Sequence, residues 1–157
     1  MDLYHALNAD HRHLDELFEA LLNSIHVDDA EAAEAAWTEL DHGLATHLEA
    51  EETYLLPVFD RFDPAEAAAI RTEHGQIRNL AAELGVLLDI HALREEKVTE
   101  FVGFLRAHAA REEAKLYPWA TRELSEAPRR SLLRRLRDRR RGIRTGLPAS
   151  RTGTTAH

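Results

Sequence analysis

The 157-residue sequence contains no cysteine, and this absence excludes several kinds of site. Without thiols there can be no disulfide framework, no thiolate metal site and no cysteine nucleophile. A metal ion would have to be held by histidine and carboxylate side chains, which suit iron, manganese and zinc. The sequence has ten histidines, so such a site is feasible.

Long apolar runs are also lacking. No stretch approaches the roughly 18 consecutive apolar residues of a membrane span. The early charges, beginning with Asp2, leave no room for the apolar part of a signal peptide. We therefore expect a cytoplasmic protein with no membrane partner. The length and the 44% hydrophobic content predict one domain with a real core.

Proline and glycine are sparse, and no segment shows the alternating pattern of a strand. Instead, apolar residues recur every three or four positions, which is the pattern of amphipathic helices. Four long helices are predicted: about 2–25, from 28 to a bend or end near Pro57, from 64 through 88, and about 92–124.

Two helix starts carry recognisable signals. Asp28 with Glu31 predicts a capping box for the second helix. Asp63 followed by Pro64 predicts the N-cap and first residue of the third helix.

The short connections between these helices imply antiparallel neighbours. The predicted fold is therefore all-α: an antiparallel up-down-up-down four-helix bundle over residues 1–124. Residues 125–157 are expected to form a short basic helix, about 128–141, and a disordered tail.

Charge is unevenly divided along the chain. Residues 1–128 carry 10 Lys/Arg against 27 Asp/Glu, whereas residues 129–157 carry 10 against one. Clustered arginine could attract nucleic acid, an anionic lipid surface or an acidic partner. The favoured interpretation is plainer: a solvated helix lying against the acidic body of its own or a neighbouring chain. Nucleic acid is the less favoured partner, and the oligomeric state stays open.

Two pairs of segments repeat. HLEAEETYLLP at 47–57 and HAAREEAKLYP at 108–118 share His, Glu, Glu, Leu and Pro at equal offsets. DHRHLDELFEAL, from Asp10, and EHGQIRNLAAEL, from Glu73, share an acid, the following His and several apolar positions. The sequence thus predicts two copies of one helical hairpin.

Six polar residues interrupt the predicted apolar stripes: His11, His47, Glu51, His74, His108 and Glu112. At 1.5 Å per residue the two histidines of each hairpin are nearly level, so all six should converge in one layer. Two unpaired glutamates there would cost several kcal/mol each. Each HxxxE pair can place an imidazole and a carboxylate on adjacent metal ions. Two metal ions with two bridging carboxylates would account for the charge.

The histidines also admit other interpretations. A single histidine on an apolar stripe is more often a hydrogen-bonded core residue than a ligand, but the repeat favours metal. The competing ferritin-like pattern, Glu-x-x-His, occurs once, at Glu39 and His42, off the inner stripe. The remaining histidines are predicted to lie on the surface: His5, His13, His26, His42 and His91.

Over about residues 3–122 the sequence resembles the hemerythrin-like, or HHE cation-binding, domains. The resemblance depends on four motifs in combination: DH, HxxxEE…LxP, EH and HxxxEE…LYP. The resemblance implies a four-helix bundle that holds a non-heme di-iron centre. It implies that the six residues above are the ligands, with Glu51 and Glu112 bridging. Glu52 and Glu113 would support the ligands or face solvent.

One departure from the family pattern concerns Arg78, which stands where oxygen-carrying hemerythrins have a further histidine. One iron would lose a nitrogen ligand, to be replaced by water or a carboxylate. Asp15 is the nearest candidate ligand, and is otherwise a surface acid. Arg78 itself would point outward or pair with an inner carboxylate. A more open site favours reaction with peroxide, nitric oxide or O2 over reversible O2 carriage.

The expected function follows from this site. The protein would bind two iron ions, with manganese or zinc as alternatives, and would bind or sense O2, peroxide or nitric oxide. Tyr54 and Tyr117 could donate a hydrogen bond to such a ligand, or could be packing residues. One alternative is a catalase-like or oxidase-type di-iron enzyme. Another is an interaction module, stapled by metal, that works through its basic helix.

Overall fold

The computed structural model describes the backbone of residues 2–145 and the side chains of residues 2–138. Every regular element in this part of the chain is a helix, so the all-α prediction is confirmed. No helix among the described residues has both the length and the apolar composition needed to cross a membrane.

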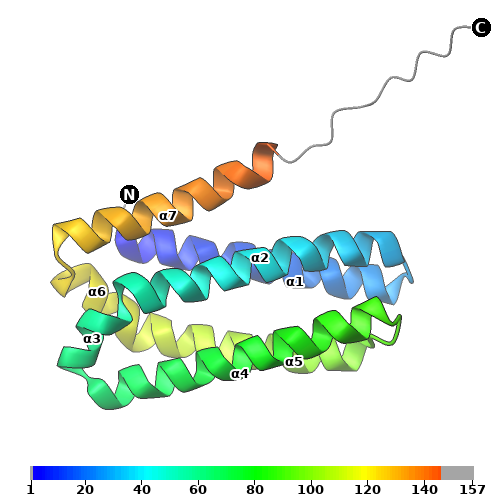
Figure 1. Cartoon of the computed structure of the whole chain (residues 1–157), viewed down its shortest axis with the longest axis horizontal. Coiled ribbons are helices and arrows are strands. Elements are labelled where there is room, and N and C mark those ends of the chain that lie inside the picture. The colour runs from blue at the N-terminus through cyan, green and yellow to red at the C-terminus, as the bar shows by residue number, and fades with distance from the viewer. Residues whose placement is uncertain (1, 146–157) are drawn as a thin grey trace, which may run out of the picture.

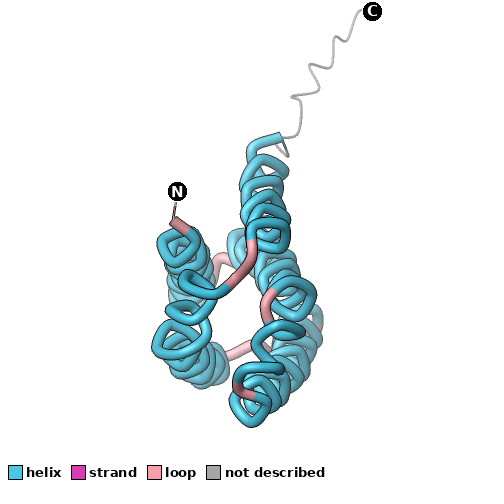
Figure 2. Tube along the Cα trace, turned by 90° about the vertical axis from the view of Figure 1, so that its left-hand side faces the viewer, coloured by secondary structure: helices cyan, strands magenta, loops and turns pink. Residues whose placement is uncertain are grey.

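Four long helices form the body: α1 (Leu3–His26), α2 (Ala30–Tyr54), α4 (Pro64–Asp89) and α5 (Glu95–Arg111). In Figure 1, α1 leads away from the amino terminus and α2 returns beside it, and α4 and α5 form a second such pair. Figure 2 looks along these helices and shows them surrounding a common axis. The helices therefore make a bundle of two hairpins.

Aspartate side chains cap the amino-terminal ends of α1, α2 and α4. Asp63 accepts a hydrogen bond from the backbone N–H of Glu66, as predicted for α4. The predicted cap of α2 is wrong by one residue, because Asp29 and not Asp28 accepts from the N–H of Ala32. Asp28 instead has a φ of 55°, a left-handed conformation that aspartate tolerates better than most residues and that turns the chain between the two helices.

A proline lies just after the end of the second helix, α2. α2 ends at Tyr54, and a short helix, α3 (Leu56–Phe62), begins with Pro57 in its first turn. The predicted end or bend near Pro57 is confirmed. Since proline has no N–H, it cannot continue the hydrogen bonding of the preceding helix, and it suits a first turn.

The predicted single helix over 92–124 is wrong in two respects. It begins at Glu95, after a loop, and it is broken by a π-helical turn, η1 (Glu112–Leu116), that leads into α6 (Tyr117–Glu123). Pro118 lies in the first turn of α6 and cannot donate to the preceding turn. The wider π turn accommodates this break, and such turns occur frequently at functional sites.

The basic helix, α7 (Glu126–Thr145), is longer at both ends than the predicted 128–141. It packs on α2 and α1, and it stands apart from the ring of four helices in Figure 2. The tail that was expected to be disordered lies outside the described residues.

Two apolar clusters make up the core. One gathers around Phe59, Tyr117 and Trp119 near the α3 and α6 end, and the other around Phe18 and Phe101 toward the opposite end. Along α1, α2, α4 and the continuous segment of α5 and η1, the six predicted site residues fall between members of these two clusters. The core is thus divided by one polar layer.

Candidate metal centre

The structure brings all six predicted residues together. They form two overlapping groups, within each of which the possible ligand atoms lie within 4.8 Å of one another. Both groups contain the two glutamates, and they differ in their histidines: His11 and His47 in one, His74 and His108 in the other. All six side chains are buried or nearly so.

Glu112 reaches into both groups. Its Oε1 lies 3.1 Å from Nε2 of His108 and 3.3 Å from Nε2 of His11. Its Oε2 lies 3.5 Å from Nε2 of His74. The carboxylate is 0% exposed, so it belongs wholly to the interior.

Glu51 makes the corresponding link from α2. Its Oε1 lies 2.9 Å from Nε2 of His47, and its Oε2 lies 3.1 Å from Nε2 of His74. A hydroxyl also reaches Glu51, because the hydroxyl of Tyr117 donates to Oε1 at 2.5 Å. Burial, reinforced by the neighbouring carboxylates, raises the pKa of Tyr117 well above its usual value, so the phenol keeps its proton.

The position of Tyr117 follows from the π turn. Tyr117 comes five residues after Glu112, and its N–H bonds the carbonyl of Glu112 across one π turn. An α-helix repeats every 3.6 residues and would separate these two side chains around its axis. The π turn lets both face the interior, where the hydroxyl also lies 2.8 Å from Nε2 of His11.

In each of the four histidines Nε2 faces the centre, and the other ring nitrogen, Nδ1, is hydrogen-bonded to a carboxylate. The Nδ1 to oxygen distances are 2.6–3.0 Å in four pairs: His11 with Glu113, His47 with Asp10, His74 with Glu52, and His108 with Glu73. An ionised carboxylate accepts, so Nδ1 carries the proton and the Nε2 lone pair faces the centre. This is the arrangement of metal-binding histidines.

The pairing explains the repeated motif. The acid before the first histidine of each hairpin, Asp10 or Glu73, binds the second histidine of the same hairpin. The second acid of each HxxxEE, Glu52 or Glu113, binds the first histidine of the other hairpin. Sequence reasoning missed Asp10 and Glu73 as supporting residues, although an acid directly before a histidine in both copies was the available signal.

Arg78 pairs with one of these outer carboxylates. Its two terminal nitrogens donate to the two oxygens of Glu52 at 2.6 and 2.8 Å. Burial raises the pKa of Glu52, but the hydrogen bonds with Arg78 and His74 outweigh it and hold that pKa below its usual value. Arg78 therefore acts on His74 through Glu52 and is not among the possible ligands. Arg111 has the same relation to His108 through Glu73.

Replacing Arg78 with alanine is expected to weaken metal binding about tenfold, since groups that orient metal ligands typically contribute that much or more. Arg71→Ala is the matched control, because Arg71 lies on the same helix and its one ion pair among the described residues is with Asp60, at 3.5 Å, on the surface. Competition with a chelator of known affinity measures the effect. Equal affinities for the two variants would contradict a supporting role for Arg78.

The remaining predicted residues lie away from the centre. Asp15 pairs with Arg106 at 2.8 Å and belongs to neither group. Tyr54 is partly buried against the core. Glu39 is exposed, and so are four of the five histidines predicted to be on the surface: His5, His26, His42 and His91. His13 is half-buried, which the sequence did not indicate.

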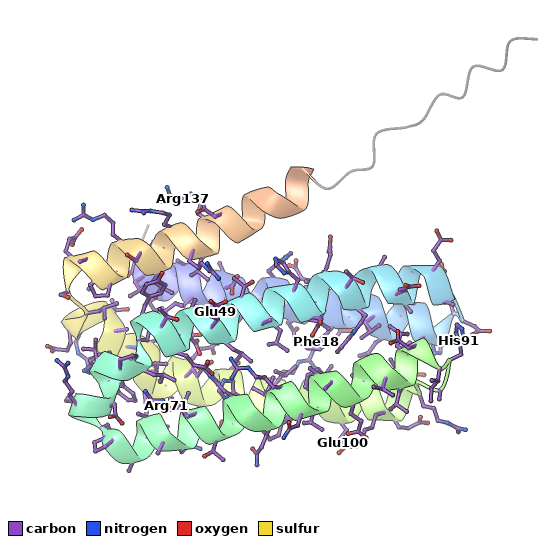
Figure 3. The ribbon with its side chains drawn as sticks, viewed as in Figure 1. Phe18, Glu49, Arg71, His91, Glu100 and Arg137 are labelled. Atoms are coloured by element: carbon purple, nitrogen blue, oxygen red, sulfur yellow. The ribbon has the colours of Figure 1, made fainter. Side chains whose placement is uncertain are left out.

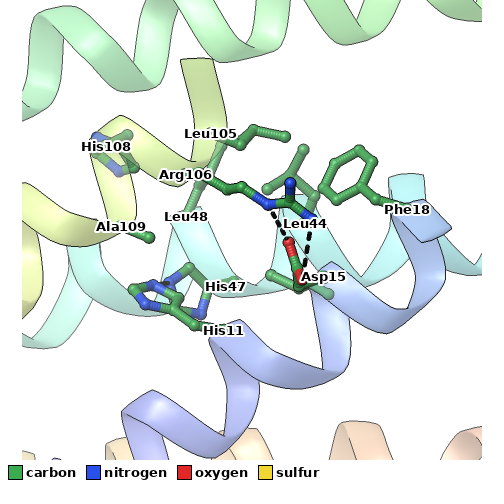
Figure 4. A pocket seen from close by; sticks show the side chains of 11 residues that line it. His11, Asp15, Phe18, Leu44, His47, Leu48, Leu105, Arg106, His108 and Ala109 are labelled. Carbon is green, nitrogen blue, oxygen red and sulfur yellow. Dashed lines mark hydrogen bonds and ion pairs between the residues drawn. The ribbon is translucent and has the colours of Figure 1, made fainter. Parts of the chain in front are cut away.

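A small cavity opens beside the first group. Its volume is about 50 Å³, and three of the site histidines border it. The rest of its lining is largely apolar and comes from α1, α2 and α5, and the Arg106–Asp15 ion pair lies at its edge (Figure 4). This volume holds a few atoms at most, so the cavity suits a very small molecule.

Several polar atoms at the centre lack hydrogen bonds. Within the described residues, five buried atoms of the six candidate ligands have no hydrogen-bond partner: Glu51 Oε2, His74 Nε2, His108 Nε2, and Oε1 and Oε2 of Glu112. They lie close to one another but are not aligned as donors and acceptors. Only histidines approach the two glutamates as ion-pair partners in the described part of the chain. Converging lone pairs with a net negative charge fit bound cations.

These features define a class: a helical bundle whose interior histidines and carboxylates could hold metal ions. The family model of the hemerythrin HHE cation binding domain matches residues 2–120, so the chain belongs to this family. No curated protein and no solved structure matches the chain.

Proposed function

We propose that this protein is a cytoplasmic non-heme di-iron protein, an antiparallel up-down-up-down bundle that binds or senses O2 or an oxygen-derived species such as peroxide or nitric oxide. The observation that carries the proposal is the pair of His2Glu2 groups that share both buried glutamates. Two groups joined in this way can hold two ions bridged by carboxylates. Manganese or zinc would suit the same side chains.

The residues have distinct roles in this proposal. The ligands of one ion would be His11 and His47, those of the other His74 and His108, with Glu51 and Glu112 shared. Bound iron would supply redox chemistry and a coordination position open to a small ligand. The four outer carboxylates orient the histidines, and Tyr117 holds Glu51 by its hydrogen bond.

The cavity supports a small, uncharged ligand. It borders His11 and His47, its wall is mostly apolar, and its 50 Å³ excludes larger organic molecules. O2, nitric oxide and hydrogen peroxide carry no net charge, so they lose little hydration on entering a largely apolar cavity. Arg106, which borders the cavity, forms an ion pair with Asp15, so its positive charge is already balanced.

Metal analysis with optical spectroscopy tests the proposal. After anaerobic reconstitution with ferrous iron we expect about two irons per chain and a spectrum that changes on adding O2, peroxide or nitric oxide. Fewer than about one iron per chain would refute it. So would a His47→Ala variant with an unaltered spectrum.

A second candidate function is peroxide decomposition or oxidase-type turnover at the same centre. The observation in its favour concerns Arg78, which is hydrogen-bonded to Glu52 and supplies no ligand nitrogen to the group of His74 and His108. That group therefore has one ligand fewer than the corresponding group of an oxygen carrier. Oxygen evolution from hydrogen peroxide by the iron-loaded protein, with the metal-free protein as control, would favour the enzyme. A stable adduct without turnover would favour the carrier or sensor.

A further inference from the structure

One face of helix α7 packs against the bundle of the same chain. Leu132 and Leu136 are buried in the apolar cluster near α3 and α6. Arg135 forms an ion pair with Glu49 on α2 at 2.8 Å. Arg129 donates to three backbone carbonyl groups at the end of α6. These contacts fix one face of α7 against the bundle and agree with the expectation that the helix lies on the acidic body.

The opposite face carries a row of arginines. Arg130, Arg134 and Arg137 are spaced by four and three residues, which places them on one side of a helix. All three are exposed, and Figure 3 shows Arg137 on the side of α7 away from the bundle. Within the described residues, Arg134 and Arg137 have no ion pair or hydrogen bond, and Arg130 approaches only Glu126, at 3.9 Å.

The same spacing continues in the sequence. Positions 141 and 144 are also arginine, and α7 extends to Thr145. Five positions separated by 4, 3, 4 and 3 residues thus share one register over 14 residues, or about 21 Å of helix. Lysine is absent from residues 129–157, so the whole positive charge of this segment is carried by guanidinium groups.

We propose that the arginine row of Arg130, Arg134 and Arg137 binds the phosphate backbone of nucleic acid without reading its sequence. A guanidinium group bonds phosphate oxygens through two parallel N–H donors. A nucleic-acid strand offers a phosphate about every 3.4 Å along the axis, so one strand can engage a row of several arginines. The inference does not depend on the metal centre.

Two other partners fit the row less well. A membrane-surface helix needs a free apolar face, but on α7 Leu132 and Leu136 are already buried in the core and Leu133 packs against it. The acidic body of a second copy presents separated carboxylates, several of which are already paired with basic side chains. The same acidic body would repel a polyanion, so contact should be confined to α7 and be weak and strongly dependent on salt.

Fluorescence anisotropy of a labelled 20-base-pair duplex tests the proposal with the full chain at low salt. The test variant is R130Q/R134Q/R137Q. The matched control is R61Q/R94Q/R122Q, which removes the same charge from three exposed arginines of the bundle. We expect the test variant to bind at least tenfold more weakly and to lower the salt slope by about 0.9 for each phosphate that it no longer neutralises. The control should change affinity less than twofold.

Several outcomes would overturn the proposal. Equal weakening by the two triple variants would show a general charge effect. Absence of duplex binding at low salt, or tighter binding to vesicles with anionic headgroups, would exclude nucleic acid as the partner. Dimerisation that depends on the arginine row, without duplex binding, would assign the row to a second copy of the chain. An E112A variant that lost duplex binding while remaining folded would contradict independence from the metal centre.

Discussion

Replacing Glu112 with alanine is expected to abolish binding of both metal ions. The carboxylate is common to the two possible cation groups, and its oxygens lie 3.1–3.5 Å from three of the four histidine Nε2 atoms. Its removal would take a shared carboxylate from both cation groups and would lower the buried negative charge at the centre. Metal content measured by elemental analysis should fall from about two ions per chain to less than about 0.3, an estimate based on a loss of more than 100-fold in affinity.

The loss of bound metal should differ between variants of different candidate ligands. His108 belongs to one group only, so His108→Ala is expected to leave about one ion, held by the other group. Glu100→Ala is the matched control, because Glu100 is an exposed glutamate on the same helix as His108 and should leave metal content unchanged. If Glu112→Ala and His108→Ala retained equal metal, the shared role of Glu112 would be wrong.

The positions of the six site residues were accessible from sequence because helical periodicity is a strong signal. Each interrupts an apolar stripe of spacing three and four, and the repeat shows that the interruptions are not accidental. Glu51 illustrates this, because it stands in a helical stripe whose other members are mostly apolar, and it is 0% exposed in the structure. The periodic pattern fixes which side of a helix is buried, whatever its exact ends.

Hydrogen-bond partners and backbone irregularities were not accessible in the same way. Glu73 could equally have faced solvent, and only the packing of α4 against α5 directs it to Nδ1 of His108. The repeat was also misleading in one respect. Leu56 and Tyr117 hold equivalent positions in the two copies, yet the first copy breaks into a new helix and the second forms a π turn. A hydroxyl therefore enters one half of the centre only.

Without metal, the centre depends on protons. Burial lowers the pKa of His74, but the carboxylates of Glu112 and Glu51 close to its Nε2 outweigh burial and raise that pKa from 6.5 to about 10. The pKa values of His47 and His108 are raised in the same way, against the effect of burial, by the nearby glutamates. The imidazolium of His74 thus offsets part of the buried carboxylate charge when no cation is bound, and stability becomes linked to pH.

The metal-free protein is therefore expected to lose stability as the pH rises. A histidine whose folded pKa is raised stabilises the fold fully below its unfolded pKa of about 6.5, and that contribution disappears as the pH rises toward 10. At about 1.4 kcal/mol per pH unit for one retained proton, the loss between pH 7 and pH 10 is several kcal/mol, or on the order of 10 °C in Tm. Thermal unfolding followed by circular dichroism in the presence of a chelator measures it.

Two comparisons separate this effect from general alkaline destabilisation. The metal-loaded protein should keep its Tm over the same range, because cations replace the protons, and should weaken instead in acid, where protonated histidines release the metal. The metal-free E51Q/E112Q variant lacks the two buried carboxylates that face the histidine Nε2 atoms, so its Tm should change much less between pH 7 and pH 10. A metal-free wild-type protein as stable at pH 10 as at pH 7 would show that protonated histidines do not balance Glu51 and Glu112.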